Sequence, residues 1–151
     1  MKLSVIVPVY NEEQTIGAVI ERIRAVNLGS IEKEIIVAND GSSDGTRRAI
    51  DEGPWRNDPG VCVLHSPINL GKGAAVRLGL QYATGDVLLT QDADLELNPE
   101  ETASCSPRSS TTAHWWCTDR VFFNRTARSP GARASRTACS RCSRTFCLAA
   151  V

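Results

Sequence analysis

The sequence predicts an α/β fold in which a parallel sheet alternates with helices. Short runs rich in Val, Ile and Leu recur along residues 1–90, as expected of strands buried on both faces of a sheet. Stretches with apolar residues at helical spacing separate these runs. Because strands joined through helices form βαβ crossovers, the strands should lie parallel in a doubly wound sheet.

Four strands are expected in this part of the chain, at residues 3–9, 35–38, 61–64 and 87–90. The first helix should begin at Asn11 as N-cap, with Gln14 completing a variant capping box, and should bury Ile and Val side chains as far as Ile23. Asp44 should cap a short second helix that runs to about Ile50. The third helix should follow residues 69–73 and carry the apolar residues Ala74, Val76, Leu78, Leu80 and Ala83.

Charge and composition change abruptly after Glu101. Residues 1–101 carry nine Lys or Arg and sixteen Asp or Glu, a net charge of −7, whereas residues 102–151 carry eight Arg and a single acid, Asp119, a net charge of +7. The second part also holds five of the six cysteines, one Leu and no Ile. We therefore divide the chain at this point and expect an irregular or disordered tail, because few aliphatic side chains are present to offset the entropy of ordering it.

Composition also excludes several classes of protein. A net charge of zero and a sequence pI of about 6.7 argue against a nucleic-acid binder. No segment approaches the roughly 18 apolar residues of a transmembrane helix. The N-terminus lacks the apolar length and cleavage site of a signal peptide. We expect a cytoplasmic protein, or one that lies peripherally at a membrane.

Polar clusters follow three of the four predicted strands, at residues 10–12, 39–42 and 92–94. In a doubly wound sheet the ligand crevice lies beyond the carboxyl ends of the strands. We therefore expect these three clusters to converge on one edge of the sheet.

The Asp92-Ala93-Asp94 cluster suits a divalent cation. Residues two apart in an extended segment point to the same side, so Asp92 and Asp94 should project together. Two hard oxygen ligands with open coordination positions suit Mg²⁺ or Mn²⁺ bound to a diphosphate, where the metal acts as a Lewis acid. The alternative is a solvated acidic turn.

Two loops offer further ligand contacts. Asn39 and Asp40 precede Gly41, which permits a tight turn, although an Asx turn that caps the next helix would use the same residues. Lys72, between two glycines at a helix start, offers a cation and backbone N–H groups to an anion, or is simply solvated. The segment is neither a P-loop nor a dinucleotide fingerprint, since Val76 stands where the third glycine would be.

Together these segments resemble the family 2 glycosyltransferases of the GT-A fold, and within them the dolichol-phosphate or polyprenyl-phosphate mannose and glucose synthases. The resemblance covers residues 1–101. The matching stretches are residues 5–12, 34–46, 69–73 and 83–95.

The resemblance implies a role for each matching residue. Asp92 would face the sugar and diphosphate, and Asp94 would be the principal metal ligand, so that both are catalytic. Asn39 stands where many relatives have Asp, which leaves the nucleotide preference open. The residues implied to line the nucleotide-sugar pocket are Pro8, Tyr10, Glu12, Val37, Asn39, Asp40, Lys72, Asp92 and Ala93.

The implied reaction transfers a hexose, mannose or glucose, from a GDP- or UDP-sugar to a polyprenyl or dolichyl phosphate, with inversion and with Mg²⁺ or Mn²⁺. Asp119 lies in no motif that would make it a general base. Three alternatives stay open: a non-catalytic nucleotide-binding remnant, a non-functional product of a shifted reading frame, and a nucleotidyltransferase. The last would favour a glycine-rich signature after the first strand, where this chain has Tyr10-Asn11-Glu12.

The tail has three interpretations. Cys139 and Cys142 could bind zinc, but no second pair has matching spacing, and the Arg-rich composition could belong to an RNA-binding arm. The third interpretation is a shifted reading frame: residues 113–122, back-translated and read one base earlier, can encode ALVVYGSRFF, the strand and Gly-Ser-Arg motif that the family has here. Residues 134–150 can likewise encode an apolar stretch. We therefore expect this chain to be a truncated and impaired family member.

Overall fold

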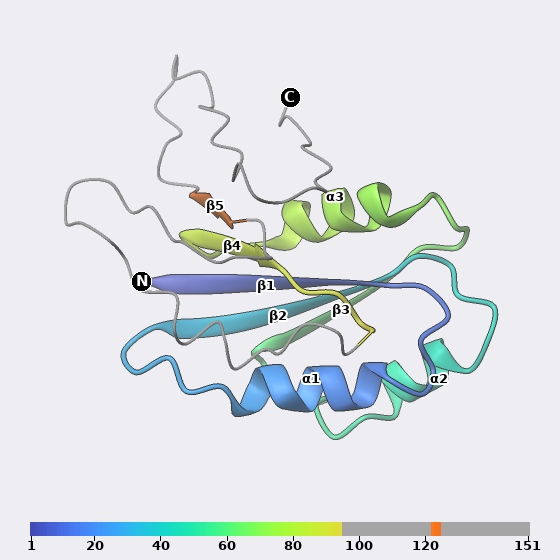
Figure 1. Ribbon diagram of the computed structural model, residues 1–151, viewed down its shortest axis with the longest axis horizontal. Coiled ribbons are helices and arrows are strands. Elements are labelled where there is room, and N and C mark those ends of the chain that lie inside the picture. The colour runs from blue at the N-terminus through green and yellow to red at the C-terminus, as the bar shows by residue number, and fades with distance from the viewer. Residues whose placement is uncertain (95–121, 125–151) are drawn as a thin grey trace, which may run out of the picture.

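The computed structural model describes residues 1–94 and 122–124, and it places a five-stranded sheet at the centre of the fold (Figure 1). The strands are β1 (Lys2–Val9), β2 (Glu32–Asn39), β3 (Val61–His65), β4 (Val87–Thr90) and β5 (Phe122–Asn124). Their order is β3-β2-β1-β4-β5, with the first four parallel and β5 antiparallel to β4. The predicted α/β fold with a parallel sheet is confirmed. The short strand β5 was not predicted, and the rest of the predicted tail lies outside the described residues.

Helices cover both faces of the sheet, as the doubly wound prediction requires (Figure 1). They are α1 (Ile16–Ala25), α2 (Thr46–Asp51) and α3 (Lys72–Tyr82). α1 and α2 lie on one face, and α3 lies on the other (Figure 1). Within residues 1–94, no helix is long and apolar enough to cross a bilayer.

The alternation of side chains along the strands divides the core into two layers. The larger layer lies between the sheet and α1, and the smaller one packs under α3 around Ile6, Ile36 and Leu88. Because both faces are covered, β1 is buried from Leu3 to Val9, which explains its nearly continuous apolar run.

The buried face of α3 is made of small residues. It consists of Ala75 and Gly79, whereas Val76 and Leu78 are partly exposed. A Cβ atom at Gly79 would lie 2.6 Å from Cγ2 of Ile6 in β1. The helix therefore approaches the sheet closely at Gly79. Of the apolar residues expected in this segment, Ala83 is buried, and Leu80 is partly buried and packs against the smaller core layer.

The prediction that Asn11 caps α1 was wrong. The helix begins at Ile16, with Thr15 at the N-cap position and no side-chain capping hydrogen bond. Asn11 instead adopts a left-handed conformation, with φ of 54°, and its Oδ1 accepts a hydrogen bond from the N–H of Ser43 at 2.9 Å. The side chain of Asn11 therefore bonds to a loop distant in the sequence instead of capping α1.

Asp44 bonds to the start of α2, although Gly45 rather than Asp44 occupies the N-cap position. Oδ1 of Asp44 accepts a hydrogen bond from the N–H of Thr46, the first helical residue, at 3.0 Å. Hydrogen bonds from Thr46 outweigh the effect of burial and lower the pKa of Asp44. The helix ends at Asp51, one residue beyond the expected end.

Candidate functional site at the carboxyl edge of the sheet

The three polar clusters converge at the carboxyl edge of the parallel strands, as predicted. β1 lies between β2 and β4, and α1 and α3 cover opposite faces, so the strand order reverses beside β1. Such a reversal is where doubly wound sheets bind ligands. Hydrogen bonds join the cluster at residues 10–12 to the segment after β2: the N–H of Asn11 donates to Oγ of Ser42 at 3.0 Å, and the N–H of Glu12 donates to Oγ1 of Thr46 at 2.8 Å.

Asp92 and Asp94 flank a buried residue. Ala93 is 5 % exposed and belongs to the core, whereas Asp92 is partly exposed and Asp94 is exposed. This alternation agrees with the expectation that the two carboxylates lie on the solvent side of the chain.

Lys72 is the cation beside this cluster. It is the first residue of α3, and its Nζ lies 2.7 Å from each carboxylate oxygen of Asp92. The ammonium thereby compensates one of the two negative charges at the predicted metal site. The Lys72 side chain is exposed and that of Asp92 is partly exposed, so water weakens this attraction and the pair can open at little cost.

The donor set fits a hard divalent cation that is shared with a diphosphate. Within residues 1–94 there is no group of three or more His, Cys, Asp or Glu side chains that would enclose a metal on its own. Mg²⁺ and Mn²⁺ commonly use one or two carboxylates, with substrate phosphates and water completing the shell. Asp92 and Asp94 could supply the carboxylates in such a shell.

Asn39 is almost fully buried, at 2 % exposure, and its amide is held on both sides. Oδ1 accepts hydrogen bonds from the N–H of Ser42 at 3.1 Å and from its Oγ at 2.7 Å. Nδ2 lies 3.1 Å from Nδ1 of His65, its register partner on β3. Nε2 of His65 in turn lies 2.9 Å from Oδ1 of Asp51.

Asp40 forms hydrogen bonds with the loop that precedes α3. It is 3 % exposed, and its two carboxylate oxygens accept hydrogen bonds from the N–H of Leu70 at 3.0 Å and of Gly71 at 2.7 Å. Gly41, with φ of 65°, forms the predicted tight turn, and a Cβ atom there would lie 2.4 Å from the backbone of Ile68. Asp40 therefore orders the loop that leads to Lys72.

The remaining predicted residues differ in accessibility. Tyr10 is 46 % exposed, and Glu12 is partly exposed with its Oε2 accepting a hydrogen bond from Oγ1 of Thr15 at 2.5 Å. Pro8 and Val37 are buried, and Val37 has no exposed surface. Tyr10 and Glu12 can touch a ligand directly, whereas Pro8 and Val37 lie behind that surface.

Sequence reasoning missed His65 and Asp51, which hold Asn39. The third strand was expected to end at residue 64, one residue before His65. The polar residue His65 at the end of the third strand was the available signal, because it lies next to Asn39 if β3 pairs with β2. That inference requires the order of the strands, which the sequence alone does not give.

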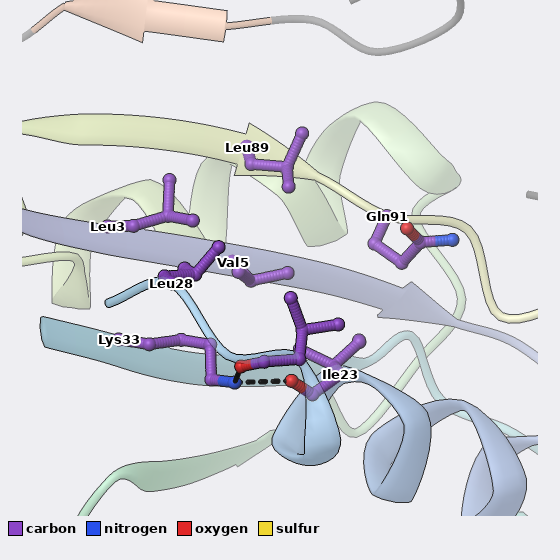
Figure 2. Close-up of a pocket in the computed structure, with 8 residues that line it drawn as sticks. Leu3, Val5, Ile23, Leu28, Lys33, Leu89 and Gln91 are labelled. Carbon is purple, nitrogen blue, oxygen red and sulfur yellow. Dashed lines mark hydrogen bonds between the residues drawn. The ribbon is translucent and has the colours of Figure 1, made fainter. Parts of the chain in front are cut away.

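Two cavities lie away from this edge. One is an apolar space of about 10 Å³ under β1 and β4, lined by residues such as Leu3, Val5 and Leu89 (Figure 2). It holds no more than about one water molecule. Beside it, Lys33 donates hydrogen bonds to the carbonyls of residues at the end of α1, among them Ile23 at 2.5 Å (Figure 2). The other is an open groove beside the first residue of β3, Val61. Neither one holds the polar groups of the candidate site.

Comparison with known proteins identifies the family. The profile of the family described as "Glycosyl transferase family 2" matches residues 4–106. The chain belongs to this family. The match begins in β1 and ends five residues after Glu101, where the composition changes.

The relatives of the chain include a sugar transferase. The chain is 38 % identical over 101 residues to an undecaprenyl-phosphate 4-deoxy-4-formamido-L-arabinose transferase of Proteus mirabilis, covering 66 % of this chain and 31 % of that protein. It thus spans about a third of the length of that relative.

Two solved structures of enzyme–ligand complexes share the fold. The mannosyltransferase PcManGT from Pyrobaculum calidifontis, in complex with GDP-Man and Mn²⁺, is 28 % identical with a TM-score of 0.55, over 61 % of this chain and 27 % of that one. S. aureus TarS residues 1–349, in complex with UDP, is 32 % identical with a TM-score of 0.55, over 62 % of this chain and 28 % of that one. The GT-A-like fold follows from these similarities.

Proposed function

We propose that residues 1–101 form the donor-binding part of an enzyme that transfers a hexose from a GDP- or UDP-sugar to a polyprenyl phosphate, with inversion. Family membership supports sugar transfer. The observation that carries the proposal for this chain is the convergence of Asp92, Asp94 and Lys72 at the strand-order reversal. Carboxylates for a metal and an ammonium for phosphate are what a nucleoside diphosphate requires in such a crevice.

Asp92 and Asp94 would hold the divalent metal, Mg²⁺ or Mn²⁺. When bound, the metal supplies Lewis-acid stabilisation for the charge that develops on the departing nucleoside diphosphate. Lys72 would exchange its partner: it pairs with Asp92 in the protein alone, and a diphosphate would offer it more negative charge. That exchange would also release the Asp92 carboxylate for the metal.

The nucleoside would lie beside Tyr10, Glu12 and Asn39. Tyr10 offers an exposed aromatic face, Glu12 offers acceptors, and Asn39 offers an amide. Pro8, Val37 and Ala93 would support this surface from behind, and Asp40 would act through the loop before Lys72.

The acceptor would be an anionic lipid phosphate at a membrane surface. The arabinose-derivative transferases acting on undecaprenyl phosphate support this choice of acceptor. A phosphate is already ionised at neutral pH and needs no strong general base, so direct attack on the sugar would give inversion. The sugar is proposed to be a hexose, and both hexose and pentose donors belong in the test.

The change of composition after Glu101 favours a second candidate, a nucleotide-binding remnant without catalysis. In that case donor binding would persist without transfer. A nucleotidyltransferase has no comparable observation in its favour.

Calorimetric titration of the chain with UDP, GDP and GDP-mannose in the presence of Mn²⁺ tests donor binding. Asp92→Asn should weaken Mn²⁺-dependent binding by roughly 10- to 100-fold, because a carboxylate ligand is lost. Glu52→Gln, which neutralises an exposed acid at the end of α2, should leave binding unchanged. Binding by neither nucleotide would refute the proposal.

Transfer is measured separately, with undecaprenyl phosphate as acceptor and with radiolabelled GDP-mannose, UDP-glucose and a UDP-pentose as donors. Product formation supports the enzyme. Nucleotide binding without product supports the remnant.

A further inference from the structure

The orientation of the Asn39 amide follows from an unambiguous donor. The backbone N–H of Ser42 can only donate, so the Asn39 atom that faces it at 3.1 Å must be the oxygen. The Ser42 hydroxyl donates to the same oxygen at 2.7 Å. The amide nitrogen of Asn39 therefore faces His65, and both acceptor positions of the amide oxygen are occupied.

The orientation of Asn39 determines the tautomer of His65. Because the Asn39 nitrogen donates, Nδ1 of His65, 3.1 Å away, must accept and carry no hydrogen. The ring hydrogen then lies on Nε2, which faces the Asp51 carboxylate at 2.9 Å. Asp51 accepts this hydrogen bond, so donors and acceptors match at every step from Ser42 to Asp51.

Three separate elements build this chain of hydrogen bonds. Asn39 ends β2, His65 ends β3 beside it in register, and Asp51 ends α2. Asn39 is almost fully buried, so water competes weakly for its hydrogen bonds, whereas the His65–Asp51 contact is exposed to solvent.

We propose that His65, oriented by Asp51, is a positioning residue that, together with Ser42, holds the Asn39 amide so that it meets the nucleotide as a hydrogen-bond donor. The Asn39 oxygen is saturated by Ser42, and one of the two Nδ2 hydrogens goes to His65. The other Nδ2 hydrogen is what Asn39 can present to a ligand. Asn39 therefore recognises a carbonyl-type acceptor of the nucleoside, and it does so as a donor. This inference rests on the proposed function, since it assumes that a nucleotide binds beside Asn39.

The first measurement reads the tautomer directly in the unmodified 151-residue chain. Long-range ¹H–¹⁵N correlation spectra distinguish an imidazole protonated at Nε2 from one protonated at Nδ1. The chain has two histidines, and the signals that vanish in His65→Phe belong to His65. We expect the neutral ring to be protonated at Nε2. A ring protonated at Nδ1 would overturn the inference, whatever the variants do.

The second measurement compares nucleotide affinity in matched variants, with UDP and GDP plus Mn²⁺ as probes. His65→Phe keeps a planar ring but removes both nitrogens, and the loss of one hydrogen bond that orients Asn39 should weaken binding by roughly 3- to 10-fold. His65→Asn retains an acceptor oxygen near the place of Nδ1 and should stay within about twofold of the unmodified chain. Asp51→Ala removes the acceptor of the Nε2 hydrogen, so the His65 ring should be held less firmly and nucleotide binding should weaken, whereas Asp51→Asn, which keeps an acceptor, should bind like the unmodified chain.

The outcomes separate the inference from the proposed function. If the unmodified chain binds and His65→Phe binds equally well, the positioning role is refuted while donor binding stands. If His65→Phe weakens binding and His65→Asn restores it, the positioning role is supported. If neither UDP nor GDP binds the unmodified chain, the proposed function fails and the positioning role fails with it. Should His65→Phe not fold, the tautomer and His65→Asn decide the question.

Discussion

At the scale of single residues, the Lys72–Asp92 pair has opposite consequences for two ligands. The Lys72 ammonium attracts phosphate but repels a divalent cation, and it occupies the carboxylate that such a cation would use. Its place at the first residue of α3 positions it beside the carboxyl end of β4. If Asp92 holds a metal and Lys72 a phosphate, as proposed, this one side chain couples the binding of metal and nucleotide.

Replacement of Lys72 by Met, which keeps an unbranched side chain but removes the charge, should change the two affinities in opposite directions. Mn²⁺ alone should bind more tightly, because Asp92 loses its competing cation, whereas UDP in saturating Mn²⁺ should bind roughly 3- to 10-fold more weakly through the loss of one charge contact. Electron paramagnetic resonance of Mn²⁺ and calorimetry of UDP measure the two effects. Arg77→Met, an exposed change on the same helix, is the matched control. Weaker Mn²⁺ binding by Lys72→Met would contradict the exchange of partners.

Glu34, at the opposite edge of the sheet, has a structural role. Burial by itself would raise its pKa, but hydrogen bonds from Lys2, Ser4 and Thr84 outweigh burial and lower the pKa to about 2. The contact distances are 2.5 Å to Nζ of Lys2, 2.5 Å to Oγ of Ser4, and 2.6 and 2.7 Å to N and Oγ1 of Thr84. The carboxylate thus joins β2, β1 and the turn before β4.

Glu34→Gln should lower the free energy of unfolding at pH 7 by about 2 kcal/mol, a figure reduced for the partial exposure of Lys2. The folded pKa lies below the ordinary value of 4.5, so this stabilisation is complete above about pH 5 and disappears as the pH falls from 4.5 toward 2. Urea unfolding at pH 7 and at pH 3 should therefore show a smaller difference between variant and unmodified chain at pH 3. Glu32→Gln, exposed on the same strand, should show no such pH dependence.

At the scale of elements, α3 approaches the sheet through small residues. Ala75 and Gly79 lie one turn apart on the buried face, and Gly79 faces Ile6 at the centre of β1. The close approach brings the first residue of the helix, Lys72, to the edge of the sheet near Asp92. The packing of α3 therefore contributes to the geometry of the site.

Gly79→Ala should destabilise the protein by about 1–3 kcal/mol, because the new methyl group overlaps the branched side chain of Ile6. This loss should exceed the gain in helix propensity of up to about 1 kcal/mol. Thermal unfolding measures the change, and Gln81→Ala, exposed on the same helix, should be nearly neutral. Greater stability of Gly79→Ala would show that α3 does not pack as closely as described.

At the scale of the whole molecule, two parts of the chain differ in their relation to the family. The family profile ends at residue 106, and the alignment with the Proteus mirabilis relative spans 101 residues. The net charge reverses after Glu101, five residues before the profile match ends. The domain boundary after Glu101 and the frameshift interpretation both remain predictions, which the closeness of these positions supports.

Sequencing the gene across the codons near Glu101 tests the frameshift interpretation. We expect a reading frame one base away to encode the strand and Gly-Ser-Arg motif, followed by an apolar segment. A repaired chain should then transfer sugar to undecaprenyl phosphate, whereas the 151-residue chain should do so weakly or not at all. Vigorous transfer by the 151-residue chain, or no family sequence in any alternative frame, would rule the interpretation out.

The local pattern of the sequence specifies the strands, the alternation with helices, and the edge at which the polar clusters meet. These features depend on spacings of two to four residues, so they can be recognised without the fold. The buried face of α3, the role of Asn11 and the partners of Asn39 could not be recognised in this way. They depend on contacts between residues distant in the sequence, such as Asn39 with His65 and Asp40 with Gly71. Only the order of the strands and the closeness of α3 to β1 decide those partners, because a side chain satisfies its hydrogen bonds with whatever the tertiary fold brings within reach.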